Sequence, residues 1–426
     1  MMNPDRVKAL KEMVASQREL MFAAERHIWK HPETGYREWK THEYLAAEYR
    51  KLGYELVEAG NIPGFYTDID TGKPGPKLLI MGELDSLIVS THPECDPETG
   101  YVHACGHHAQ SAALLGIAAA LKQPGALDGM SGSIRLMAVP AEELIEIGYR
   151  ASLREQGIIK YFGGKVEFMY RGFMDDCDIA LLVHTSNSEH KGIGVGVGNN
   201  GCLTKNINYE GVSAHAGGAP HLGVNALYAA NLGLNAVNAL RETFQEKDTI
   251  RFHPIITKGG DLVNVVPADV RIETFCRANN MEAIEDASMK VNRALKAGAD
   301  AVGAEVEIVD IPGYMTPYEC PEMKAVVEDN LALIYGKENV VPGVGYTTEA
   351  NDVAHLLPVV HCTIGGAEGI AHSSHYEIRD KDSAYIKATK MLLCSAIDLL
   401  ANGAEKGLSV KKNFKAPMTK EEYLRT

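Results

Sequence analysis

The sequence has little that would direct it to nucleic acid or to a membrane. Its 426 residues carry 42 basic and 56 acidic side chains, a formal net charge of −14. It therefore lacks the positive field that nucleic acids and anionic lipids attract. The longest apolar run, residues 112–121, is far shorter than the ~20 residues needed to span a bilayer. We expect neither nucleic acid nor a membrane as a partner.

The sequence also lacks paired cysteines and a secretory leader. Its eight cysteines are scattered without the spacing of a disulfide framework, as in proteins of reducing compartments. The first residues, Met-Met-Asn-Pro-Asp-Arg-Val-Lys, have no apolar core of the kind found in signal peptides. Both features predict a cytoplasmic protein.

The pattern of apolar residues predicts an α/β domain made from two separate parts of the chain. A chain of this length exceeds what one hydrophobic core accommodates, so we expect two domains. Continuous apolar runs predict buried strands, and helical patterns lie between them, which predicts a mostly parallel sheet flanked by helices. The runs are residues 77–82, 133–139, 178–183 and 359–364, and helices are expected at residues 322–335 and 384–400. We assign residues 1–199 and 313–426 to this domain.

Residues 200–312 show a different order of elements and predict an inserted domain. The expected strands are residues 203–209, 249–257, 269–277 and 305–311, and the expected helices are residues 224–243 and 281–298. This β-α-β-β-α-β order is that of a ferredoxin-like α+β fold.

Residues that bind metals follow the predicted strands or precede a predicted helix. Cys105 and His107 flank a glycine before an apolar helix, Glu142 and Glu143 follow a strand and a proline, and His184 ends another strand. His372 and His375 lie in a later loop. Each has an ordinary alternative explanation, such as a small buried cysteine, a capping histidine or a solvated acidic pair. Because open α/β sheets bind ligands at the carboxyl ends of their strands, we expect these side chains to lie together.

Together these residues predict metal-assisted hydrolysis of an acyl bond. Thiolate, imidazole and carboxylate groups are sufficient ligands for two first-row divalent ions. Adjacent residues in extended chain point in different directions, so one of Glu142 and Glu143 can bind an ion while the other faces a water. Asp85 follows the strand at residues 77–82 and is placed to orient a ligand.

Seven short motifs occur in a fixed order along nearly the whole chain. They are His31-Pro-Glu-Thr-Gly35, Gly82-Glu-Leu-Asp85, Ala104-Cys-Gly-His107, Pro140-Ala-Glu-Glu143, Ser213-Ala-His-Ala216, Asn264-Val-Val-Pro267 and His372-Ser. In this order they resemble the aminoacylase-type family of metal-dependent amidohydrolases and carboxypeptidases. The branch that the sequence resembles most contains hippurate, indole-acetyl-amino-acid and p-aminobenzoyl-glutamate hydrolases.

The resemblance implies a role for each candidate residue. It implies one or two divalent ions, zinc or manganese, bound by Cys105, His107, Glu143, His184 and His372. It implies that Glu142 activates water and then protonates the leaving amine, and that Asp85 orients a ligand. His215 would reach into the active site of a partner subunit and stabilise the oxyanion. Asn264, Arg277 and Asp352 would help to hold the substrate, and residues 200–312 would form the lid and dimerisation domain of a homodimer.

The sequence departs from the family pattern beside the expected metal site. His108 and Gln110 stand where many members have aspartate and histidine, and Glu83 stands where others have aspartate or histidine. These changes leave open an additional ligand and the roles of Glu83, His108 and His375. The expected reaction is hydrolysis of the amide of a small N-acyl or aminobenzoyl-type amino acid. The alternatives are a dipeptidase or aminopeptidase of the same family, a catalytically silent ligand-binding homologue, and a thiol hydrolase that uses Cys105 with His107.

Overall fold

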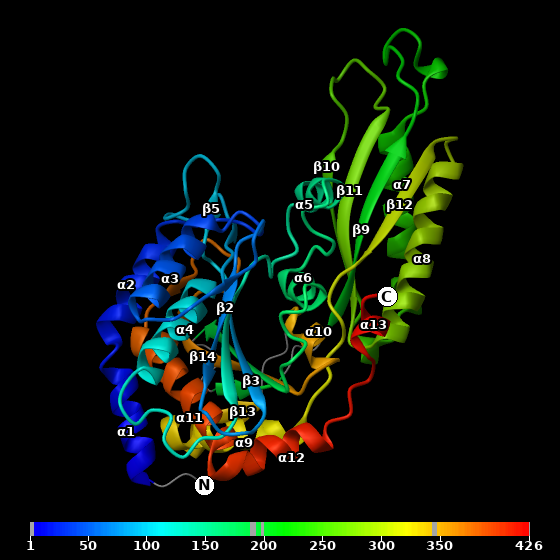
Figure 1. Ribbon diagram of the computed structural model, residues 1–426. Coiled ribbons are helices and arrows are strands. Elements are labelled where there is room, and N and C mark those ends of the chain that lie inside the picture. Colours follow the sequence, from blue (N-terminus) through cyan, green and yellow to red (C-terminus); the bar gives the residue numbers. More distant parts are fainter. Residues whose placement is uncertain (1–3, 188–192, 197–199, 343–346, 426) are drawn as a thin grey trace. The chain divides into compact units, whose positions relative to one another are not determined.

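The computed structural model describes residues 4–187, 193–196, 200–342 and 347–425, and the chain separates into two compact units (Figure 1). The first unit comprises Met1–Val197, Tyr318–Gly345 and Asp352–Thr426. The second comprises Gly198–Pro317 and the short segment Tyr346–Asn351. One continuous stretch of chain therefore interrupts the first unit.

A mixed β-sheet forms the centre of the first unit. Its order is β1 (Val57–Glu58), β2 (Phe65–Asp70), β6 (Ser133–Val139), β3 (Lys77–Glu83), β7 (Ile179–Asn187), β14 (Val359–Glu368), β8 (Ile193–Val195) and β13 (Val340–Pro342), with β15 (Glu377–Ile378) paired to β14. The strands β6, β3, β7 and β14 are parallel, whereas β1, β2 and β15 pair in antiparallel fashion. This confirms the expected α/β class, and it brings the carboxyl ends of four strands to one edge.

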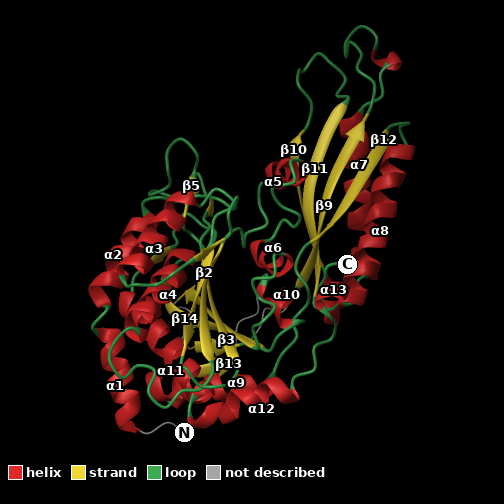
Figure 2. Cartoon of the chain, in the orientation of Figure 1, coloured by secondary structure: helices red, strands yellow, loops and turns green. Residues whose placement is uncertain are grey.

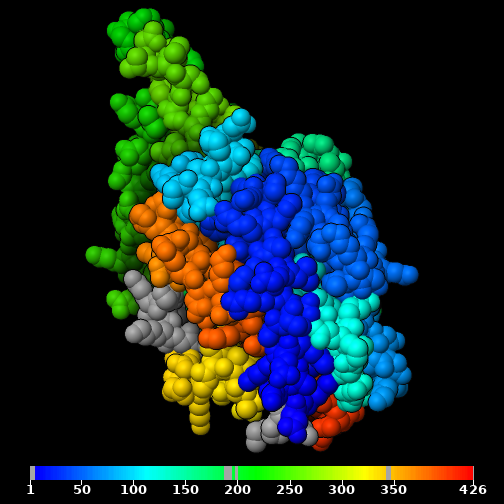
Figure 3. All heavy atoms as spheres, turned by 90° about the vertical axis from the view of Figure 1, so that its left-hand side faces the viewer, coloured from blue at the N-terminus to red at the C-terminus, as the bar shows by residue number. Residues whose placement is uncertain are grey.

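The helix α4 (His107–Leu121) is buried along its whole length and packs against β3 and β7. A helix that is apolar on all sides needs cover on all sides. The cover is provided by α1 (Pro4–Ala15), α2 (Arg18–Trp29), α3 (Trp39–Lys51) and α11 (Ala388–Leu400). The N-terminal helices form much of the face in Figure 3 (blue), beside a C-terminal segment (orange). Among the described residues, no helix combines the length and apolar character that crossing a bilayer requires.

The remaining elements of the first unit are shorter. They are the hairpin of β4 (Leu87–Ile88) and β5 (Tyr101–Val102) and the helices α5 (Ile147–Glu155), α6 (Gly164–Tyr170), α9 (Pro321–Tyr335), α12 (Glu405–Asn413) and α13 (Lys420–Tyr423). The helix α10 (Ala350–Ala354) begins inside a segment that the sequence predicted to be a loop. The Thr348 hydroxyl accepts a hydrogen bond from Ala350 N at 3.2 Å and so caps this helix.

The second unit has the predicted ferredoxin-like topology (Figure 2). Its elements are β9 (Gly201–Glu210), α7 (Ala226–Ala239), β10 (Arg251–Lys258), β11 (Asp269–Ala278), α8 (Met281–Asp300) and β12 (Glu305–Pro312). The sheet order is β10-β11-β9-β12, and every pair is antiparallel. Side chains of Asn225 and Asn280 cap the two helices, which explains where each begins.

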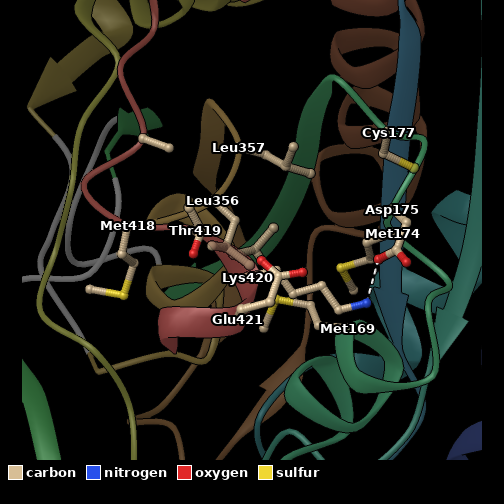
Figure 4. Close-up of a pocket in the computed structure, with 12 residues that line it drawn as sticks. Met169, Met174, Asp175, Cys177, Leu356, Leu357, Met418, Thr419, Lys420 and Glu421 are labelled. Atoms are coloured by element: carbon tan, nitrogen blue, oxygen red, sulfur yellow. Dashed lines mark hydrogen bonds and ion pairs between the residues drawn. The ribbon is translucent and has the colours of Figure 1, made fainter. Parts of the chain in front are cut away.

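A pocket of about 460 Å³ lies in the first unit between the C-terminal segment and the chain around α6 (Figure 4). Its lining is mostly apolar and includes Met169, Met174, Leu356 and Leu357. At its rim, Lys420 Nζ donates to Asp175 Oδ1 at 2.6 Å. None of the residues that line this pocket is a predicted metal ligand.

Candidate metal centre

The turn at Gly106 places Cys105 and His107 at the start of α4. Gly106 has φ +111°, a left-handed conformation, and a Cβ there would overlap Thr185 Oγ1 and Tyr376 OH. Glycine alone avoids both the strain and the overlap. At the N-terminus of a helix the dipole also favours the thiolate form of cysteine.

The five predicted ligands and Glu142 form one cluster. Potential ligand atoms lie within 4.8 Å of one another in each of three groups: Cys105, His107 and His184; Cys105, Glu143 and His372; and His107, Glu142 and Glu143. Cys105 Sγ is 3.2 Å from His184 Nε2, and Glu143 Oε1 is 3.0 Å from His372 Nε2. Because Cys105 belongs to two groups, its sulfur is placed to bridge two ions.

Asp85 connects two members of this cluster. Its Oδ1 lies 3.1 Å from His107 Nδ1, and its Oδ2 accepts a hydrogen bond from Glu143 N at 2.8 Å. The contact with Asp85 assigns the proton of neutral His107 to Nδ1. The Nε2 atom then presents its lone pair to the cluster, and within the described part of the chain it makes no hydrogen bond.

The surroundings favour the charge states that metal ligands need. Burial opposes ionisation of Cys105, as does Glu143, but His107 and His184 lower the pKa of the thiol to about 6. Burial likewise opposes ionisation of Glu143, but His372 lowers the pKa of this carboxyl to about 2. Thiolate and carboxylate are therefore the forms present at neutral pH.

Glu142 has the opposite electrostatic behaviour. Burial raises the pKa of its carboxyl well above the ordinary value, and the charges of Glu83 and Glu143 raise it further. Its Oε2 lies 3.9 Å from His107 Nε2. A carboxylate of raised basicity beside metal ligands is suited to take a proton from water and to return it.

A buried ion pair that the sequence did not reveal lies beside His107. Glu83 Oε1 is 2.5 Å from Lys165 Nζ on α6, and Glu83 Oε2 accepts from Gln110 Nε2 at 2.6 Å and lies 3.2 Å from His107 Nε2. Burial alone would raise the pKa of Glu83, but Lys165 and nearby histidines hold it well below the ordinary value. Glu83 belongs to none of the three ligand groups. A single lysine in a helix carries no signal in one sequence, so only the fold identifies this partner.

The other two residues whose roles were open lie outside the ligand groups. His108 is fully buried, with its ring 5.5 Å from that of His103 and 4.9 Å from that of Trp29. His375 is exposed, and its backbone N–H bonds Ser373 Oγ at 3.3 Å.

Three predicted substrate residues belong to the second unit, at two different places. His215 and Asn264 are both exposed and adjacent, because Ala216 N donates to Asn264 O at 2.9 Å and His215 forms a β-bridge with Val265. Arg277 lies at the other end of β11, where it pairs with Cys202. The separation along the strand is eight residues, 277 − 269, or about 26 Å at ~3.3 Å per residue.

Asp352, the fourth predicted substrate residue, is fully buried in the first unit. Its Oδ1 accepts a hydrogen bond from Tyr423 OH at 2.6 Å. The C-terminal helix α13 is thereby tied to α10.

The donor set fits divalent metal ions. One thiolate, three imidazoles and one carboxylate converge, and His107 presents an otherwise unbonded nitrogen to them. Mixed sulfur and nitrogen ligation suits zinc, and carboxylate and imidazole also suit manganese.

The fold and this cluster define a metal-dependent hydrolase. The family model for peptidase family M20/M25/M40 matches residues 79–398, and the chain belongs to this family. It is 26% identical to the Xaa-Arg dipeptidase of Mus musculus over 97% of this chain and 93% of that protein. It is 28% identical to one of the two polypeptides of the p-aminobenzoyl-glutamate hydrolase of Escherichia coli, over 66% of this chain and 55% of that polypeptide. It is 25% identical to indole-3-acetyl-aspartic acid hydrolase of Enterobacter agglomerans, over 70% and 66%.

Solved structures share the fold. An aminohydrolase from methicillin-resistant Staphylococcus aureus matches with a TM-score of 0.71 and 23% identity, covering 92% of this chain and 99% of that one. A dinuclear metal-binding peptidase of the same family from Bacillus subtilis matches with a TM-score of 0.65 and 17% identity, covering 91% and 99%. The expected family and fold are therefore confirmed, and the chain is an enzyme that hydrolyses amide bonds with divalent metal ions.

Proposed function

We propose that this enzyme hydrolyses the amide of a small N-acyl or aminobenzoyl-type amino acid and releases a carboxylic acid and an amino acid. The observation that carries the proposal is Glu142, a basic carboxylate placed 3.9 Å from His107 in a cluster of five metal ligands. Relatives that hydrolyse p-aminobenzoyl-glutamate and indole-3-acetyl-aspartate support this class of substrate.

Each residue of the cluster has a role in the proposed reaction. When bound, the divalent ions supply a Lewis acid for the substrate carbonyl and lower the pKa of water. Glu142 accepts the proton of the attacking water and passes it to the leaving nitrogen. Asp85 keeps the Nδ1 proton on His107, so that Nε2 stays available as a ligand.

His215 is the proposed oxyanion donor. Its Nδ1 accepts hydrogen bonds from Gly217 N at 3.2 Å and Gly218 N at 3.0 Å. The neutral ring therefore carries its proton on Nε2, and because His215 is exposed, this N–H is available to a negatively charged oxygen.

The second unit is the proposed lid and dimerisation domain. His215 and Asn264 lie about 26 Å from Arg277 along the sheet. One copy of the unit cannot place all three on one small substrate, whereas two copies in a homodimer can, with His215 and Asn264 acting on the partner's substrate.

Exposed apolar side chains support a dimer through this unit. The edge strand β10 exposes Ile255 and Ile256, by 53% and 49%, and α7 exposes Tyr228 and Leu232, by 63% and 42%. An edge strand with apolar side chains is a surface that another chain is expected to cover.

Two finer points complete the proposal. Zinc and manganese are the proposed ions, because both suit the ligand set. The cytoplasm is the proposed location, because all eight cysteines are free thiols, as a reducing compartment would keep them.

A second candidate function is hydrolysis of dipeptides. The observation in its favour is the match to the Xaa-Arg dipeptidase over 97% of this chain. A dipeptidase must recognise a free α-amino group, which an N-acyl amino acid lacks.

One experiment separates the two candidates. The purified protein is assayed on a panel of acetyl-, benzoyl- and aminobenzoyl-amino acids and on dipeptides, including Xaa-Arg, with and without a chelator. We expect chelator-sensitive turnover of the N-acyl compounds. Turnover confined to dipeptides would replace the proposal with the second candidate. Activity that survives the chelator but is lost on alkylation would instead indicate a thiol hydrolase that uses Cys105.

The Glu142→Gln variant tests the assigned base in the same assay. Removing a general base lowers kcat by about 10²–10⁴-fold. The metal content should stay at the wild-type value, because Cys105, His107, Glu143, His184 and His372 remain. A catalytically silent homologue would show no turnover in either protein.

A further inference from the structure

The backbone turns in a strained conformation just before Glu142 and Glu143. Ala141 is completely buried and has φ +57°, in the left-handed region. This conformation costs a residue with a Cβ about 1–3 kcal/mol and persists only where the surroundings enforce it. Here it aims the two carboxylates that the proposed chemistry uses.

Charged side chains hold the polar backbone groups on both sides of the turn. Glu38 Oε1 accepts from Ala141 N at 2.7 Å, and Asp85 Oδ2 accepts from Glu143 N at 2.8 Å. Arg150 Nη1 donates to Ala141 O at 3.3 Å, and Arg150 Nη2 donates to Glu143 O. Glu38 and Arg150 are both buried, with 0% and 1% exposure. Two charged groups placed out of water, bonded to one short stretch of backbone, form a rigid clamp.

The clamp explains the motif His31-Pro-Glu-Thr-Gly35, which contains no residue of the three ligand groups. A Cβ on Gly35 would overlap Arg150 Nη2, so glycine leaves the space that the guanidinium occupies. Glu33 Oε2 accepts from Lys40 N at 2.9 Å and Thr41 N at 3.2 Å, and so fixes the start of α3 just after Glu38. The motif thus builds the support for the turn.

We propose that Glu38 and Arg150 are positioning residues that hold Ala141 in its left-handed conformation and thereby aim Glu142 and Glu143. Without the clamp, Ala141 relaxes to an ordinary φ and redirects the two following side chains. The group Cys105, Glu143 and His372 then loses a ligand, whereas the group Cys105, His107 and His184 contains no residue of the turn. One ion should be weakened selectively. The inference rests on the proposed ligand set but not on the proposed substrate.

The test measures Zn²⁺ binding to the metal-depleted full-length protein in competition with a chromogenic chelator, with Tm recorded alongside. Glu38→Ala should weaken one Zn²⁺ equivalent by about 10–100-fold, the usual effect of removing a group that orients a ligand. Glu38→Gln keeps an acceptor for Ala141 N and should stay within about 3-fold of wild type. Adding Ala141→Gly to Glu38→Ala should restore most of the affinity, because glycine adopts positive φ without strain.

Glu33→Ala is the matched control from the same motif. It removes the cap of α3 and should lower Tm, yet leave both Zn²⁺ equivalents unchanged. If Glu38→Ala does not fold, Glu38→Asp, whose carboxylate is one methylene shorter, replaces it in the same comparison. The inference is overturned if the Glu38 variant binds both equivalents like wild type, if it weakens both equally, or if Ala141→Gly restores nothing. Because no substrate is used, failure on N-acyl amino acids would count against the proposed function alone.

Discussion

At the scale of single residues, the buried histidines of the first unit fall into two groups. Those of the metal centre lie beside acidic or sulfur groups, as His107 does beside Asp85 and His184 beside Cys105. His103 and His108 are instead fully buried, and within the described part of the chain neither ring nitrogen of either residue has a hydrogen-bond partner. Burial lowers the pKa of His103 to about 3 and that of His108 well below its usual range. Both are therefore neutral in the folded protein.

This difference makes stability depend on pH with a definite sign. In the unfolded chain these histidines bind a proton below about pH 6.5, whereas folded His103 does so only near pH 3. Their contribution is complete above about pH 6.5 and is lost as pH falls toward 3, by up to about 1.4 kcal/mol per pH unit for each residue.

We expect His103→Leu to flatten the acid side of the stability profile. Between pH 6.5 and pH 4, Tm of the variant should fall less than that of wild type, because the variant has one fewer histidine to protonate on unfolding. His221→Leu, at an exposed position of the second unit, is the control and should leave the slope unchanged. Equal slopes for wild type and His103→Leu would mean that His103 is already protonated in the fold.

At the scale of secondary-structure elements, the short helix α6 supports the floor of the metal centre. Lys165 extends from it to Glu83, and both side chains are buried, with 0% and 1% exposure. A buried ion pair is costly to break, because the remaining charge keeps its desolvation penalty without its partner.

Lys165→Met should therefore destabilise the protein by about 3–5 kcal/mol. Adding Glu83→Gln to that variant should recover part of the loss, because no unpaired charge is then left buried. Urea denaturation of the metal-free proteins measures both changes, with Lys160→Met at an exposed site as the control. Additive effects of the two substitutions would show that the pair is not energetically coupled.

At the scale of the whole molecule, the proposed homodimer makes each active site the product of two chains. Glu142→Gln disables the site in its own chain, whereas His215→Ala disables the site of its partner. A mixed dimer of the two variants should therefore contain one complete site.

Co-expression of the two inactive variants should restore activity. With random pairing, half of the dimers are mixed and each has one working site of two, so about a quarter of wild-type activity is expected. Each variant alone should be at least about 10²-fold less active than wild type, as for loss of a general base or an oxyanion donor. If the mixture stays inactive while light scattering shows dimers, His215 does not act across the interface.

Much of the organisation was predictable because it follows from short-range patterns. Continuous apolar runs marked β3, β6, β7 and β14, and the element order marked the ferredoxin-like unit. The rule that polar residues gather at the carboxyl ends of parallel strands placed Cys105 and Glu143 in one cluster. The assigned roles of the ligands, of Glu142 and of His215 stay predictions until the variants are measured.

Other features could not be read from the sequence, because they depend on contacts between residues that are distant in the chain. Lys165 meets Glu83 across 82 residues, and Glu38 meets Ala141 across 103. A lysine and a glutamate of this kind have no periodicity or motif that distinguishes them from solvated surface charges. Similarly, the segment expected to be a loop begins α10 only because Thr348 caps it.

The sequence by itself determined the kind of protein: which segments form strands and helices, which family the chain belongs to, and which residue types can bind metal. These follow from local apolar periodicity and from the chemistry of side chains near strand ends. Only the tertiary structure decided which charges are buried, how the strained turn at Ala141 is held, and which nitrogen of His107 and His215 is available. The physical reason is that desolvation, hydrogen-bond partners and backbone strain arise from neighbours in space, whatever their separation along the chain.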